Sequence, residues 1–119
     1  MITRIAGKVA SRSRAVIHNG IVTTVATSPI KSASMLEQAR GALAAIDRNL
    51  ADAGTNKAKI ITAMVYLADM SRKNELNQAW DEWVDMANAP QRACLGVALE
   101  GADLVEVVVT AAVQGAGIP

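Results

Sequence analysis

The segment from residue 34 to residue 54 carries a helical pattern that constrains the rest of the fold. Its apolar residues recur at steps of three and four positions, which places them on one face of a helix. They are Leu36, Ala39, Leu43, Ile46 and Leu50. Ser34 and Glu37 have the spacing of a capping box at the start of this helix, and Gly54 is a natural stop. A helix with one apolar face must pack that face against a second layer of secondary structure, so the rest of the chain has to supply this layer.

Six runs rich in β-forming residues supply the second layer. They span residues 2–5, 14–17, 21–27, 59–67, 91–99 and 104–113. His18, Asn19 and Gly20 separate the second run from the third, and an Asn-Gly pair accepts the positive φ of a tight turn. We therefore predict a β-hairpin there, and a further turn over residues 100–103.

A second helix is predicted over residues 73–87 and is ended by Pro90. Its apolar face consists of Leu76, Trp80, Trp83 and Ala87. Two tryptophans three positions apart on a helix usually pack into the core, and we interpret these two in that way.

The order of elements is β-β-β-α-β-α-β-β, which predicts an α+β fold with two helices on one face of a sheet. The 119 residues fit one domain spanning 1–119. Hydrophobic residues make up 51% of the chain, more than a domain of this size can bury. Since no third layer is left in the sequence for the other face of the sheet, we expect a symmetric partner to cover it.

Several classes of protein fit this sequence poorly. Cys94 is the one cysteine, so no intrachain disulfide can form, and a reducing, cytoplasmic location is the simplest interpretation. Arg4 and Lys8 interrupt the first ten residues, which argues against a secretory signal peptide. No run of about 18 apolar residues predicts a membrane span.

The charge and the motifs of the chain bear on which partners and cofactors it can bind. A net charge of +1, with no phenylalanine, argues against a nucleic-acid partner, which usually meets a basic stripe and stacking aromatics. One histidine and one cysteine cannot form a usual zinc site, and no glycine-rich loop follows a strand, so we expect neither metal nor cofactor. The single histidine, His18, lies in a turn, where histidines are mostly solvated.

The remaining chemistry lies in two strands. Arg92 and Cys94 alternate along one strand, so they share a face, and a guanidinium there can bind a carboxylate bidentately. The alternatives for Arg92 are a structural salt bridge with Glu100 or Glu106, or exposure at a strand end. Glu106 is the single charge within residues 105–113, so it lies on a solvated face or is held for proton transfer.

The same segments resemble the Rid (reactive intermediate deaminase) family, also known as YjgF or L-PSP endoribonuclease. The resemblance rests on the pattern Pro90-x-Arg92-x-Cys94, on Glu106 between two valines, and on the order of elements over about residues 14–113. Residues 74–84 and 17–19 are most similar to the YoaB-type branch.

The resemblance implies a chorismate-mutase-like trimer, in which three sheets close a central barrel and small carboxylates bind between subunits. It implies hydrolysis of 2-imino and 2-enamino acids, such as 2-aminoacrylate and 2-iminopropanoate, to a 2-keto acid and ammonia. In that case Arg92 grips the substrate carboxylate, Cys94 lines the pocket and Glu106 positions the attacking water.

Two segments depart from the deaminating members of that family. Those members carry a pocket-closing tyrosine where this chain has Arg12, and a Ser-Gly pair where it has Val25 and Ala26. Arg12 and Ala26 are therefore candidate pocket residues of altered character. An imine deaminase is the leading hypothesis, a non-catalytic or regulatory trimer that binds a small carboxylate is the alternative, and a ribonuclease is a third.

Overall fold

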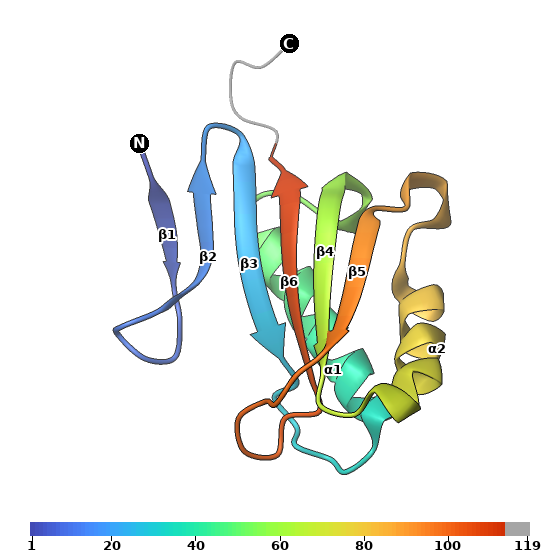
Figure 1. The fold of residues 1–119 in the computed structure, drawn as a ribbon. Coiled ribbons are helices and arrows are strands. Elements are labelled where there is room, and N and C mark those ends of the chain that lie inside the picture. Colours follow the sequence, from blue (N-terminus) through green and yellow to red (C-terminus); the bar gives the residue numbers. More distant parts are fainter. Residues whose placement is uncertain (114–119) are drawn as a thin grey trace.

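In the computed structural model, which describes residues 1–113, six strands form one sheet and two helices lie behind it (Figure 1). The last six residues of the expected 1–119 unit lie outside the described part. The main elements are β1 (Thr3–Ala6), β2 (Ser13–His18), β3 (Ile21–Thr27), α1 (Met35–Asp52), β4 (Ile60–Leu67), α2 (Lys73–Trp83), β5 (Gln91–Gly96) and β6 (Val105–Ala112). Short 3₁₀ turns at Lys57–Lys59, Met70–Arg72 and Met86–Asn88 join some of them.

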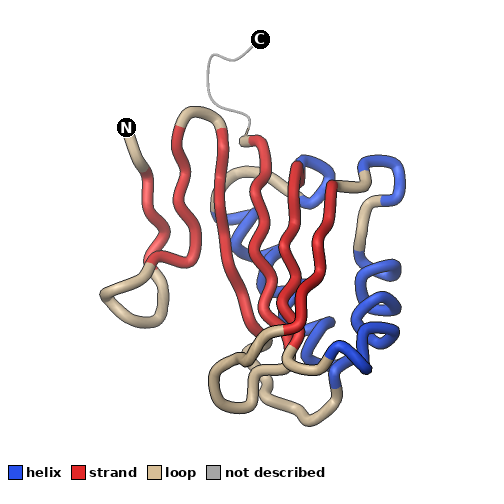
Figure 2. Tube along the Cα trace, in the orientation of Figure 1, coloured by secondary structure: helices blue, strands red, loops and turns tan. Residues whose placement is uncertain are grey.

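The strands lie in the order β1-β2-β3-β6-β4-β5 (Figure 2). All neighbouring pairs are antiparallel except β4 and β5, which are parallel and are connected through α2. The last strand of the chain, β6, is inserted between β3 and β4, so it is central in the sheet. These features confirm the predicted α+β class and the predicted order of elements.

Helix α1 follows the predicted stripe closely. Ala39, Leu43, Ile46 and Leu50 are all buried, and Gly54 ends the helix region with a φ of +86°. At the start, the Ser34 hydroxyl accepts from the Glu37 backbone N–H at 3.2 Å. The return half of the capping box differs from the prediction, because the Glu37 carboxylate accepts from the Ser32 hydroxyl and Ser32 in turn accepts from the Ser34 N–H.

The hairpin between β2 and β3 forms as predicted, with φ of 51° at Asn19 and 75° at Gly20. Most strand ends fall within one or two residues of the prediction. Strand β5 is shorter than predicted, ending at Gly96 rather than at residue 99. Its partner β4 ends at Leu67, whose carbonyl accepts the last hydrogen bond of the pair from the Val97 N–H. Beyond Val97, the residues that follow β5 therefore have no β4 backbone to pair with.

The predicted end of the second helix was wrong. Helix α2 ends at Trp83 and not at residue 87, because Val84 adopts an extended conformation and Asp85 caps a separate 3₁₀ turn by accepting from the Ala87 N–H. Ala87 is consequently exposed and not part of the apolar face. Trp80 is buried as predicted, and Trp83 packs partly buried against the core.

The two faces of the sheet differ in what covers them. The side chains of β6 alternate between buried and half-exposed, and those that face the helices form the core, for example Val105, Val107 and Val109. The opposite face has no covering element within residues 1–113 and exposes Val25 and Leu95, among others. We refer to it below as the open face.

Candidate functional site

Arg92 lies on the edge strand β5, and its side chain leaves the sheet on the side of the helices. The register pairs it with Ala63 of β4, which is buried beneath the helices. Arg92 Nη2 donates to Asn77 Oδ1 of α2 at 2.9 Å, and Cζ lies 5.2 Å from the centre of the Trp80 ring. The guanidinium is thus held against α2 while remaining partly exposed.

Neither carboxylate that the sequence suggested as an ion-pair partner of Arg92 is in place. Within the described residues, four ion pairs form, and Arg92 takes part in none of them. The structural salt bridge with Glu100 or Glu106 is therefore not formed. A partly exposed guanidinium without a carboxylate partner is free to bind an external anion.

Cys94 lies two residues after Arg92 on the same face of the sheet, as the alternation predicts. It is paired with Val65 of β4 and packs, partly buried, against the core. Both Arg92 and Cys94 are therefore half-buried on the helix side of β5.

Glu106 lies on the open face, at the start of β6. Its register partners are Tyr66 on β4 and Thr27 on β3. It is half-exposed and lines a hollow of about 470 Å³ between the sheet and the loop that joins β1 to β2. The same hollow is lined by Arg12, Val25 and Ala26. Of these, Ala26 pairs with the buried Val107 and belongs to the core under the helices, so its side chain does not share the open face with Glu106.

Arg92 and Glu106 are separated by the sheet. Arg92 aligns through Ala63 with the buried Val109, whereas Glu106 projects from the other side of β6. A second hollow of the open face, of about 540 Å³, includes Arg92 in its lining beside Val108 and Thr110 but does not include Glu106. One chain therefore cannot present both side chains to a small ligand, and a site that uses both must combine two copies.

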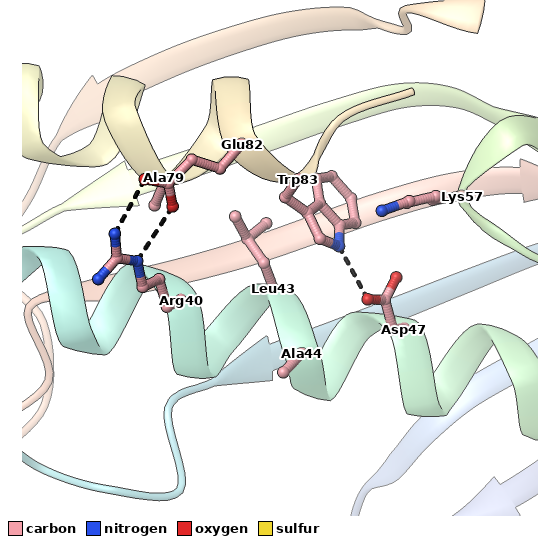
Figure 3. A pocket seen from close by; sticks show the side chains of 8 residues that line it. All are labelled: Arg40, Leu43, Ala44, Asp47, Lys57, Ala79, Glu82 and Trp83. Carbon is pink, nitrogen blue, oxygen red and sulfur yellow. Dashed lines mark hydrogen bonds and ion pairs between the residues drawn. The ribbon is translucent and has the colours of Figure 1, made fainter. Parts of the chain in front are cut away.

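A third hollow lies between the two helices and contains none of the predicted site residues (Figure 3). Its polar groups are largely paired with each other. Arg40 donates two hydrogen bonds to Glu82, which lowers the pKa of that carboxyl and raises the pKa of Arg40. The Trp83 indole donates to Asp47 at 3.0 Å. These bonds tie α1 to α2, so we interpret the hollow as part of helix packing.

Residues 1–113 contain no cluster of three or more His, Cys, Asp or Glu side chains arranged to hold a metal ion. Neither helix of this region is long and apolar enough to cross a membrane.

The comparisons with known proteins agree with one another. Residues 4–113 match the family model described as endoribonuclease L-PSP. A RutC family protein of Haemophilus ducreyi is 42% identical over 117 residues, covering 96% of this chain and 98% of the relative. The chain belongs to the YjgF/Rid family.

Two more relatives place the chain within that family. The RutC family protein YoaB of Escherichia coli is 35% identical over 102 residues, covering 85% of this chain and 90% of that protein. A crystal structure of a YjgF family member from Neisseria meningitidis superposes with a TM-score of 0.91 at 33% identity, covering 98% of each chain. The resemblance predicted from Pro90, Arg92, Cys94 and Glu106 is thereby confirmed at the level of the family.

Two residues that support Arg92 escaped the sequence reasoning. Trp80 was interpreted as core alone, and Asn77 entered only as part of a segment that is similar to the YoaB-type branch of the Rid family. Their spacing of three places them on one face of α2. That spacing is the sequence signal from which a contact shared by both residues could have been inferred. That the contact is Arg92 depends on the pairing of β5 with β4, which the spacing does not reveal.

Proposed function

We propose that this YjgF/Rid chain is a deaminase that hydrolyses 2-imino and 2-enamino acids to 2-keto acids and ammonia. The observation that supports this most is the state of Arg92, a partly exposed guanidinium held by Asn77 and Trp80 without a carboxylate partner among the described residues. Its planar fork matches a substrate carboxylate bidentately, which fixes the orientation of the adjacent imine carbon.

The reaction needs little more than orientation and a proton acceptor. Water adds to C2 of the imine, the nitrogen takes up a proton, and the tetrahedral intermediate expels ammonia to leave the 2-keto acid. Glu106 orients the water and accepts its proton, and it comes from a second copy because it lies across the sheet from Arg92 of the same chain. Cys94 lines the substrate pocket beside Arg92, and Arg12, together with the largely buried Ala26, borders it near Glu106.

A homotrimer of one-domain subunits, each spanning 1–119, is the assembly that suits this chemistry. The open face exposes apolar side chains such as Val25 and Leu95, and a symmetric closure of three sheets would bury them. The same closure would bring Arg92 of one copy toward Glu106 of another. The lone cysteine fits a reducing compartment, and we infer a cytoplasmic protein.

The test generates 2-aminoacrylate in situ with a serine dehydratase and follows the decay of the resulting imine. Wild-type protein should accelerate the decay, and Arg92→Ala should abolish the acceleration. Glu106→Gln should bind a small carboxylate normally and turn over about 10²-fold or more slowly, since it cannot accept the proton. Arg48→Ala, which removes an exposed arginine of α1, is the matched control and should behave as wild type. Acceleration that survives Arg92→Ala would contradict the proposal.

The second candidate is a non-catalytic trimer that binds a small carboxylate. Arg12 favours it, because this flexible cation lines the hollow around Glu106 where deaminating relatives of the Rid family carry a tyrosine. Arg92-dependent binding of pyruvate without turnover of several imines would select this function. Ribonuclease activity, which the family description mentions, has little support from a net charge of +1, and an RNA cleavage assay at low salt tests it.

A further inference from the structure

We propose that Asn77 and Trp80 are positioning residues that fix the orientation of the Arg92 guanidinium without neutralising its charge. This inference rests on the proposed role of Arg92 as the group that binds the ligand carboxylate. It adds two residues of α2 to the machinery, neither of which touches the substrate itself.

The geometry restrains the guanidinium in two independent ways. The Trp80 ring lies 5.2 Å from Arg92 Cζ, and Asn77 Oδ1 accepts from Nη2 at 2.9 Å. Trp80 is itself buried and packs against Trp83 with ring centres 5.3 Å apart, so the ring is a fixed support. A ring contact limits displacement of the planar group, and a hydrogen bond at one edge limits its rotation.

The choice of partner separates Arg92 from other arginines of the chain. Arg14, Arg40 and Arg72 each form an ion pair with a carboxylate, to Asp52, Glu82 and Glu75 respectively. Arg92 instead donates to a neutral amide. The Asn77 oxygen accepts from one N–H of the fork and adds no negative charge, so the remaining donors keep their full attraction for an incoming carboxylate.

Substitution of Asn77 by aspartate tests the charge argument almost without changing shape. Asn77→Asp should hold Arg92 at least as firmly, so the melting temperature should be unchanged or higher. Because the new carboxylate competes with the ligand, KM for the imine and the dissociation constant for pyruvate should rise about tenfold or more, with kcat changed much less. Asn74→Asp, which adds the same charge to an exposed position of α2, is the control and should leave both constants near wild type.

The orienting role has a readout that does not depend on a ligand. In ¹H–¹⁵N spectra, the Nη resonances of Arg92 should show hindered rotation in the wild type, and Asn77→Ala should restore fast rotation. Trp80→Leu should weaken pyruvate binding, and Trp80→Phe should recover part of it. If Asn77 only holds the fold together, Asn77→Asp should instead leave ligand binding unchanged.

The outcomes distinguish this inference from the proposed function. Protein that binds pyruvate through Arg92 but hydrolyses no imine would refute the deaminase alone and leave the positioning role to the aspartate test. Pyruvate binding in Asn77→Asp equal to that in Asn74→Asp would overturn the inference, as would Nη rotation unaffected by Asn77→Ala. Wild-type protein that binds no small carboxylate would refute both.

Discussion

Replacement of Gln38 by leucine should destabilise the protein strongly, although the substitution makes the core more apolar. Gln38 is fully buried in α1 and makes three hydrogen bonds to the backbone. Its Nε2 donates to the Ser32 carbonyl at 2.6 Å and to the Ala102 carbonyl at 2.9 Å, and its Oε1 accepts from the Leu104 N–H at 2.9 Å. It thereby joins the start of α1 to the loop that leads into β6 and Glu106.

The expected magnitude follows from those three bonds. Each is worth about 1 kcal/mol net, and each partly buried partner left without a hydrogen bond adds part of a desolvation penalty of about 1–3 kcal/mol. After a partial offset from the added apolar side chain, the free energy of unfolding should fall by about 3–5 kcal/mol. For a chain of this length, that corresponds to a melting temperature lower by about 12–20 °C.

The assay is urea and thermal unfolding followed by circular dichroism at a fixed protein concentration, since association would shift the transition. Gln78→Leu is the matched control, because Gln78 is exposed and makes one long hydrogen bond of 3.4 Å, and its effect should stay within about 0.5 kcal/mol. If Gln38→Leu is too unstable to purify, Gln38→Glu should be recoverable at acidic pH, where the protonated carboxyl can donate to one carbonyl. A loss below about 1 kcal/mol for Gln38→Leu would refute the reasoning.

Three further changes test other parts of the fold. Gly41→Ala should lower stability despite the better helix propensity of alanine, because the added Cβ would collide with the Ser28 side chain; unfolding measurements that show a gain of about 1 kcal/mol would contradict this packing. Gly20→Ala should cost about 1 kcal/mol in the same assay, since φ there is +75°, and an unchanged midpoint would argue against the turn geometry. The Arg40 guanidinium lowers the pKa of Glu82, so the stability difference between wild type and Glu82→Gln should be fully present above the ordinary glutamate pKa of about 4.3 and should shrink as pH falls through the lowered value. If the stability difference between wild type and Glu82→Gln grows as the pH falls, the Arg40–Glu82 ion pair does not stabilise the protein as described.

The division of the candidate site between two faces of the sheet bears on how activity and assembly are linked. Arg92 is oriented by α2 within its own chain, whereas Glu106 faces a side of the sheet that lacks a covering element within residues 1–113. If both act on one substrate, dilution to monomers should abolish turnover even while Arg92 stays folded in place. A single-chain site would not show this concentration dependence.

The sequence by itself determined the features that depend on neighbours along the chain. The stripe from Leu36 to Leu50 specified α1 because helical spacing is a local property, and Asn19 and Gly20 specified the hairpin because positive φ is a property of those residues. Alternation along β5 likewise placed Arg92 and Cys94 on a common face. The end of α2 was missed because Asp85 starts a new 3₁₀ turn, a competing local choice that the apolar pattern does not encode.

Only the tertiary structure decided which residues lie on the helix side of the sheet and which lie on the open face. Alternation states that residues share a side of their own strand, but the absolute side depends on pairing between strands far apart in the sequence. The insertion of β6 between β3 and β4 put Glu106 on the open face, and the parallel pairing of β5 with β4 put Arg92 under α2. The contacts of Arg92 with Asn77 and Trp80 follow from that placement, because they form across elements that no local periodicity connects.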